Sequence, residues 1–117
     1  MLSITPDGRI TINAAAVRIA RDARITSVLL LWDRVNHRLA LKAAQRGDKN
    51  SYALSIVAAS HSGSLRAKSF LGHIGWKAHK RETMSIIWNE KEKMFEVTLP
   101  LEHLESEPSS VKRSGAN

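Results

Sequence analysis

Gly8-Arg9-Ile10-Thr11-Ile12-Asn13 starts a pattern that this chain uses twice. The run leads through an apolar segment into Val28-Leu29-Leu30-Leu31-Trp32-Asp33, then into a polar turn and an alternating segment at residues 38–42. A second copy begins at Gly63 and reaches Trp88, so that the two glycines are 55 residues apart and the two tryptophans 56. Because the same features recur in the same order, the sequence predicts an internal duplication with one inserted residue.

Each copy is predicted to fold as two strands, a short helix and a hairpin. In the first copy, Ile10 and Ile12 alternate with polar residues, as in a strand with one buried face, and Asn13 can cap the helix that follows. The run from Val28 to Trp32 is apolar at every position, which predicts a strand buried on both faces. The predicted elements are strands at residues 3–5 and 9–13, a helix at 14–24, and a hairpin of 28–32 and 38–42.

The second copy follows a polar loop at residues 43–51. Gly75 is placed to end its helix in the left-handed conformation that closes many helices. Residues 101–104 can form one last turn, and residues 105–117 are polar and rich in Ser, so we expect these to be disordered. The predicted elements of this copy are a strand at residues 52–58, a helix at 67–74, and a hairpin of 84–88 and 94–99.

The size of the copies determines the domain organisation. A unit of about 35 residues is too small to bury a sufficient core alone, so the copies must share one core or find one in a partner. The expected division is a first repeat at residues 1–46, a second, degenerate repeat at 47–101 and a tail at 102–117. The fold class is predicted to be α+β, mostly β, with two pseudo-repeats around one core.

Composition also indicates a compartment. The 117 residues contain no Cys, which excludes disulfide and thiolate chemistry and favours a reducing environment. No apolar run approaches the ~18 residues needed to span a membrane. Residues 1–7 lack the basic and apolar regions of a signal peptide. We therefore expect a soluble, cytoplasmic protein.

The chain is basic, with 18 Lys and Arg against 11 Asp and Glu and a formal net charge of +7. The excess lies in the two copies, because the segment after Pro100 carries more acidic than basic residues. This distribution predicts a polyanionic partner, of which nucleic acid is the commonest. The alternative is an ordinary soluble surface, because the basic residues are scattered along the chain.

The run from Ile4 to Ile12, continued by residues 28–41, resembles the swapped-hairpin DNA-binding domains of the AbrB, MazE and MraZ type. The resemblance implies an interlocked barrel of swapped hairpins that binds double-stranded DNA, as a transcriptional regulator or antitoxin-like protein. It also implies twofold symmetry, reached either within one chain as a pseudo-dimer or between chains as a homodimer. Arg9 matches the arginine of the family's Gly-Arg pair. Asn13 stands where the family usually has Pro, and Ser64 replaces the arginine in the second copy.

The candidate DNA contacts are basic residues of both copies. Those on the predicted first helix are spaced to form a cationic ridge, although a solvated face whose Arg stems cover apolar surface explains them equally well. The expected contacts to the DNA backbone are Arg9, Arg18, Arg21, Arg24, Arg66 and Lys68.

A rival interpretation is a protein-interaction or assembly module on the same fold. Exposed edge strands, together with Trp32 and Trp88, would then bind protein chains. Packing at the edge of the core accounts for these two Trp residues better than stacking on bases does.

Catalysis and metal binding are not expected. The five His residues fit no ligand spacing, and Ser60-His61-Ser62 has no acidic residue nearby to orient the imidazole. The sequence therefore predicts a non-enzymatic binding protein without a metal or cofactor.

Overall fold

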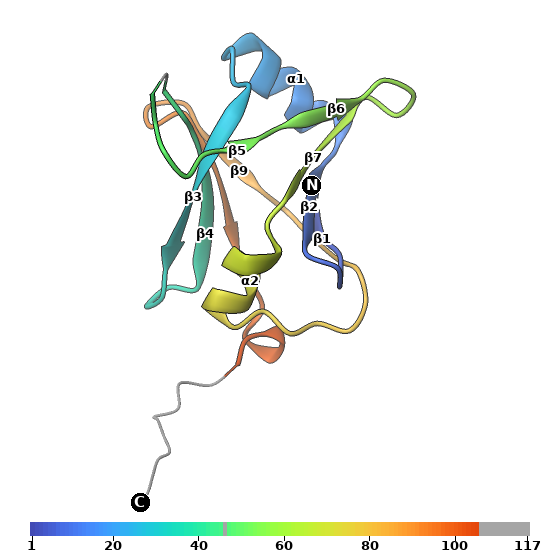
Figure 1. Cartoon of the computed structure of the whole chain (residues 1–117), viewed down its shortest axis with the longest axis vertical. Helices are drawn as coiled ribbons and strands as arrows, with labels where there is room; N and C mark the ends of the chain where they lie inside the picture. Colours follow the sequence, from blue (N-terminus) through green and yellow to red (C-terminus); the bar gives the residue numbers. More distant parts are fainter. Residues whose placement is uncertain (46, 106–117) are drawn as a thin grey trace, which may run out of the picture.

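The computed structural model describes residues 1–45 and 47–105, which form two antiparallel sheets and two α-helices (Figure 1). The fold class, α+β and mostly β, is confirmed. The elements up to residue 45 are β1 (Leu2–Ile4), β2 (Arg9–Ile12), α1 (Ala14–Asp22), β3 (Ser27–Asp33) and β4 (Arg38–Ala43). Those after residue 47 are β5 (Tyr52–Ala53), β6 (Ser55–Val57), β7 (Ser62–Arg66), α2 (Lys68–Ile74), β8 (Glu82–Met84), β9 (Ile87–Asn89), β10 (Met94–Thr98) and the 3₁₀ turn η1 (Leu101–His103).

Both sheets combine strands from the two predicted copies. Sheet A has the strand order β6-β7-β2-β1-β8, and sheet B has the order β5-β3-β4-β10-β9. At the centre of sheet A, β2 pairs antiparallel with β7 and Ile10 lies opposite Leu65. At the centre of sheet B, β4 pairs antiparallel with β10 and Leu41 lies opposite Phe95. In each sheet, one strand of the central pair therefore comes from residues 1–46 and the other from residues 47–101.

The closed barrel implied by the resemblance is not formed, because the described strands make two sheets. Kinked segments join these sheets on both sides. Only Leu54 separates β5 in sheet B from β6 in sheet A, and Figure 1 shows this segment crossing between the sheets. On the other side, the chain leaves β8 in sheet A and enters β9 in sheet B after two residues. The strand predicted at 52–58 is therefore split, as is typical where strands turn a corner.

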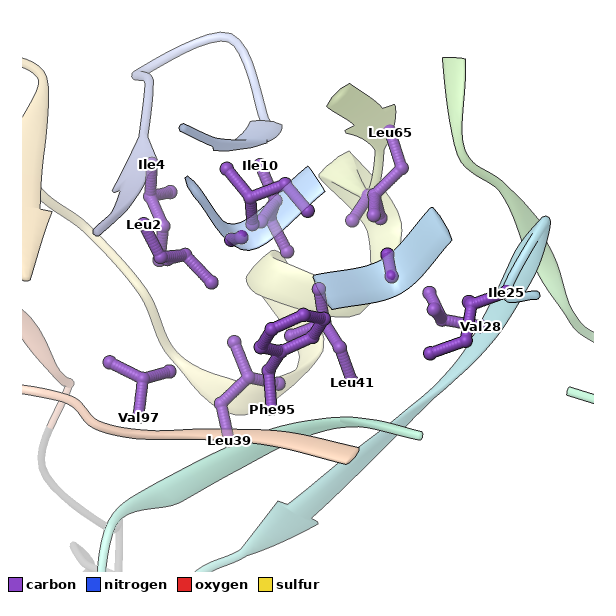
Figure 2. Packing of buried hydrophobic residues seen from close by; sticks show 14 of the residues in the cluster. Leu2, Ile4, Ile10, Ile25, Val28, Leu39, Leu41, Leu65, Phe95 and Val97 are labelled. Carbon is purple, nitrogen blue, oxygen red and sulfur yellow. The ribbon is translucent and has the colours of Figure 1, made fainter. Parts of the chain in front are cut away.

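One hydrophobic core lies between the sheets (Figure 2). Val17 of α1 and Leu71 of α2 pack into the same cluster. Burial of each such side chain contributes about 1.5–3 kcal/mol, so the two halves depend on each other for stability. The largest of the fully buried side chains are Leu2, Ile4, Ile10, Ile12, Val28, Leu39, Leu41, Phe95 and Leu99.

Local interactions explain the turn and the helix near the N-terminus. Gly8 has a φ of +89°, and a Cβ there would lie 2.5 Å from the Cα of Lys68, so only glycine fits. Asn13 caps α1 as predicted, because its Oδ1 accepts a hydrogen bond from the backbone N–H of Ala16 at 3.2 Å. The helix ends at Asp22, two residues earlier than predicted, because Arg24 adopts a left-handed φ of +59°.

Left-handed residues recur at matching places in the two halves. At the end of each helix, a backbone N–H donates to the carbonyl five residues earlier: Ile25 to Ala20 at 2.8 Å and Trp76 to Leu71 at 2.9 Å. Gly63, which the sequence aligns with Gly8, lies instead inside β7. The matching positive-φ residues are Gly8 and His61 in the strand turns, Arg24 and Gly75 at the helix ends, and His37 and Lys93 in the hairpin turns.

Three further predictions are corrected. The strand β3 is not buried on both faces, since Val28 is 1% exposed and Leu31 42%. The hairpin arm predicted at 84–88 is shortened to β9, because Met84 pairs with Leu2 in sheet A. The tail does not begin at residue 102, because the turn predicted at 101–104 forms as η1 and a bridge between Leu104 and Trp76 folds this part onto the domain. Residues 106–117 lie outside the described residues.

Candidate nucleic-acid interface

The face of sheet A that points away from the core is polar. Residues directly opposite one another in an antiparallel pair share a face, and successive residues of a strand alternate between faces. Because Ile10 and Leu65 point into the core, Arg9, Thr11, Ser64 and Arg66 lie on the outer face. The strand registers add the hydroxyl groups of Ser55, Ser62 and Thr83 to this face, together with the buried Ser3, which is hydrogen-bonded to Thr83, and one exposed apolar residue, Val57.

Arg9 and Arg66 lie directly opposite each other in the β2–β7 pair. The side chain of Arg66 is exposed and that of Arg9 partly exposed. Cβ atoms of such a pair lie about 5 Å apart, and like charges at this spacing repel. Neither residue forms an ion pair with any residue in the described part of the chain. The pair is therefore a small, concentrated positive site.

Lys68 adds a third positive charge beside this pair. Its Cα and Cβ pack against Gly8, the residue before Arg9. A hydrogen bond of 2.8 Å from the backbone N–H of Ala67 to the carbonyl of Gly8 holds the start of α2 against the β1–β2 turn. The structure thus brings together Arg9, Arg66 and Lys68, which we call the turn cluster.

Asp7 is the acidic residue of the same turn. A hydrogen bond donated by the Thr5 hydroxyl is the main cause that lowers the pKa of Asp7, and the positive charges of Arg9 and Arg66 lower this pKa further. Asp7 is therefore ionised at neutral pH and balances part of the charge of the turn cluster. One carboxylate leaves a net positive site.

The other three predicted contacts do not join the turn cluster. Arg18, Arg21 and Arg24 are exposed on and just after α1, which follows the opposite end of β2. Figure 1 shows α1 and α2 near opposite ends of β7. Arg21 and Arg24 line a groove of about 210 Å³, together with apolar residues of α1 and of the β5–β6 segment. The six predicted cations therefore form two groups.

Trp32 and Trp88 are half-buried and pack against the core. The ring of Trp88 lies 4.8 Å from that of Phe95, and its Nε1 donates to the Glu90 carboxylate at 2.8 Å. Both contacts anchor the side chain at the edge of sheet B, as expected for core-edge packing.

A cleft that the sequence did not indicate separates β8 from β10. Its volume is about 630 Å³, and its lining includes Arg38, Glu82 and Glu96. The Nη1 atom of Arg38 lies 3.9 Å from Oε1 of Glu96, and Nε2 of His103 lies 3.3 Å from Oε2 of Glu82. These residues come from distant segments of the chain, so their meeting leaves no local signal in the sequence. The acidic residues make this cleft unsuited to a polyanion.

The His and Ser side chains weighed as metal ligands or nucleophiles lie within the described residues. Among residues 1–45 and 47–105, no group of three or more His, Cys, Asp or Glu is arranged to hold a metal ion. The hydroxyl groups of Ser60 and Ser62 hydrogen-bond to each other at 2.7 Å. None of the helices that the structure describes has the length and apolar character needed to cross a membrane.

Comparisons with protein-family models, with curated proteins and with solved structures find no match to this chain.

Proposed function

We propose that this protein is a small DNA-binding regulator that contacts the phosphate backbone through the outer face of sheet A. The single observation that carries the proposal is the pairing of Arg9 with Arg66 across β2 and β7. Two arginines at directly opposite positions of neighbouring strands can direct several N–H donors to the oxygens of one phosphate. Lys68 extends this positive site toward the start of α2.

The surroundings of the turn cluster suit the same ligand. Hydroxyl groups and arginines are both common donors to DNA phosphates, and Thr11 and Ser64 continue the outer face beyond the arginines. The net charge of +7 would attract DNA over a longer range. These contacts position a protein on the duplex and carry no sequence information themselves.

The arrangement of the halves supports an AbrB-like tandem repeat as part of this proposal. The matching positive-φ residues occupy the same turns in both halves, and the central pairs β2–β7 and β4–β10 join equivalent strands. One chain would then supply the twofold symmetry that single-copy relatives of the AbrB type obtain by dimerising. The protein would act as an intramolecular pseudo-dimer.

Fluorescence anisotropy with a labelled duplex at several salt concentrations tests the proposal. Binding should weaken with salt, with a log–log slope of about −0.9 for each phosphate neutralised. The double variant R9Q/R66Q should bind less tightly and reduce this slope by about 2.

The matched control is K49Q/K91Q, which removes the same charge from two exposed loop positions. It should change binding much less than R9Q/R66Q does. Equal losses of DNA affinity in the two double variants would show that net charge alone explains the binding. Absence of binding at low salt would exclude the proposal.

A second function, protein interaction, is favoured by one specific feature. The edge strand β6 pairs with β7 on one side only, and Ile56 and Val57 are 44% and 45% exposed. Such an edge can accept a further strand.

A further inference from the structure

We propose that β6 and the adjoining α1 groove form a docking site for an extended acidic peptide segment, which adds to sheet A as a sixth strand. This proposal concerns a different surface from the turn cluster and does not depend on DNA binding. It specifies the site and the ligand chemistry of the protein-interaction alternative.

The first support is the symmetry of sheet A. The order β6-β7-β2-β1-β8 is symmetric about the central β2–β7 pair except at its ends. On the β1 side, β8 continues the sheet, with Met84 opposite Leu2 and Glu82 opposite Ile4. On the β6 side, no described strand occupies the equivalent place. The fold therefore already pairs a short antiparallel strand with one of two equivalent edges and leaves the other open.

The second support is the absence of protective charge. Natural edge strands usually avoid unwanted pairing through charged residues, Pro or bulges. Residues 50–65 contain no Asp, Glu, Lys, Arg or Pro, although 25% of the chain is charged. The edge strand β9 of sheet B, by comparison, is followed directly by Glu90-Lys91-Glu92-Lys93. The edge at β6 is thus unprotected, in contrast to β9.

The third support is the groove beside the edge. Ile56 lies opposite Gly63, whose missing side chain faces Val17 and Leu54. Between α1 and residues 54–56 lies a groove of about 210 Å³ lined by Val17, Ala20, Ile25, Leu54 and Ile56. A strand added to β6 would place every second side chain on the face that carries Ile56. The groove can receive one apolar side chain from this face of the added strand.

Charge decides between the candidate occupants. Arg21 and Arg24 also line the groove, and neither forms an ion pair within residues 1–45 and 47–105. A second copy of this chain, paired through β6, would bring two more arginines to the same region and would be repelled. A partner strand with acidic residues on either side of its apolar residue would instead meet both guanidinium groups. The site therefore fits an acidic peptide.

The test uses the intact protein and a synthetic probe, Thr-Glu-Thr-Val-Thr-Glu-Thr. In this peptide both Glu side chains share the strand face of Val. The control peptide, Thr-Thr-Glu-Val-Glu-Thr-Thr, has the same composition, but its Glu residues lie on the opposite face. Backbone amide NMR signals report where each peptide binds, and a titration gives its affinity.

We expect the first peptide to shift the amide signals of Ser55, Ile56 and Val57, and to slow hydrogen exchange at those of the three whose N–H points away from β7. The control peptide should bind about tenfold more weakly, and R21Q/R24Q should weaken the first peptide by a similar factor. R9Q/R66Q should leave peptide binding unchanged, which separates this test from the DNA experiment. The variant Ile56→Lys, whose folding is verified by its thermal melt, should abolish binding.

Three results would overturn the proposal. The first is the absence of shifts in β6 with millimolar peptide. The second is equal binding of the two peptides, because this would show attraction to net charge alone. The third is a concentration-dependent dimer in light scattering that Ile56→Lys abolishes, because the open edge would then belong to a second copy.

Discussion

Arg9 and Arg66 face each other across the central strands of sheet A, although 56 residues separate them in the chain. Their backbones are held by the β2–β7 ladder and by the packing of Ile10 and Leu65 beneath them. The Cα and Cβ atoms of the two arginines therefore cannot separate without disruption of the core, and the two side chains start from neighbouring positions. Like charges held in this way favour an anionic ligand, at a small cost to the stability of the free protein.

This cost is measurable. At low salt, Arg66→Gln should stabilise the protein by about 0.2–1 kcal/mol, because it removes the repulsion from Arg9. The gain should shrink as salt screens the charges. Thermal melts at low and high salt provide the measurement. Arg66→Gln introduced into an Arg9→Gln background should give no such gain, and an equal gain in both backgrounds would argue against repulsion.

The turn at Gly8 should tolerate no side chain. Gly8→Ala places a Cβ at a φ of +89° and 2.5 Å from the Cα of Lys68, so we expect a loss of more than about 2 kcal/mol in the free energy of unfolding. Chemical denaturation measures this loss. Gly72→Ala is the matched control, because Gly72 lies within α2 with nothing near its Cβ position. That variant should be as stable as the parent or more stable, by up to about 1 kcal/mol.

In the folded protein, the pKa of the Asp7 carboxyl should lie below its ordinary value of 3.8. A carboxyl whose pKa is lower in the folded than in the unfolded state stabilises the fold above the unfolded pKa. This contribution is lost as the pH falls through the lower, folded pKa. Side-chain NMR titration should show that Thr5→Val raises the pKa of Asp7 more than Arg66→Gln does, because the Thr5 hydrogen bond is the larger cause. The reverse order would contradict this account.

Phe95 should be essential to both halves. It is 2% exposed, lies opposite Leu41 and contacts Trp88, so Phe95→Ala should destabilise the protein by about 3–5 kcal/mol. Because the core is shared, the loss should appear in a single cooperative transition that amide exchange detects in β2 as well as in β10. Val35→Ala, at a position 84% exposed, should change stability by less than about 0.5 kcal/mol. Two separate transitions would show that the halves fold independently.

Several elements could be predicted from the sequence because short-range interactions form them. The Asn13 cap uses an amide three residues away, and Gly75 closes α2 by a φ of +90° that glycine adopts without strain. The turn before β4 follows from Asp33, whose carboxylate accepts hydrogen bonds from the backbone of Val35 and Asn36. The composition of these segments determines such features wherever the segments lie in the fold.

The candidate sites could be predicted only in part. The sequence identified Arg9, Arg66 and Lys68 as cations but gave no sign that they converge, because only the β2–β7 register brings them together. It also grouped them with Arg21 and Arg24, which the fold places beside a different groove. The sequence did not predict the hydroxyl groups on the outer face of sheet A, because Ser and Thr are common in turns as well as in strands.

The sequence by itself determined the hairpin turns, the cap of α1, the end of α2 and the alternation of buried residues in β2, because each depends on neighbours within a few positions. Tertiary structure alone decided that residues 52–57 change sheets at Leu54, that β8 pairs with β1, and that β6 keeps an open edge. These outcomes depend on which distant strands compete for the same hydrogen-bonding edge. Local pattern does not encode that competition, because a strand presents the same alternation to every partner.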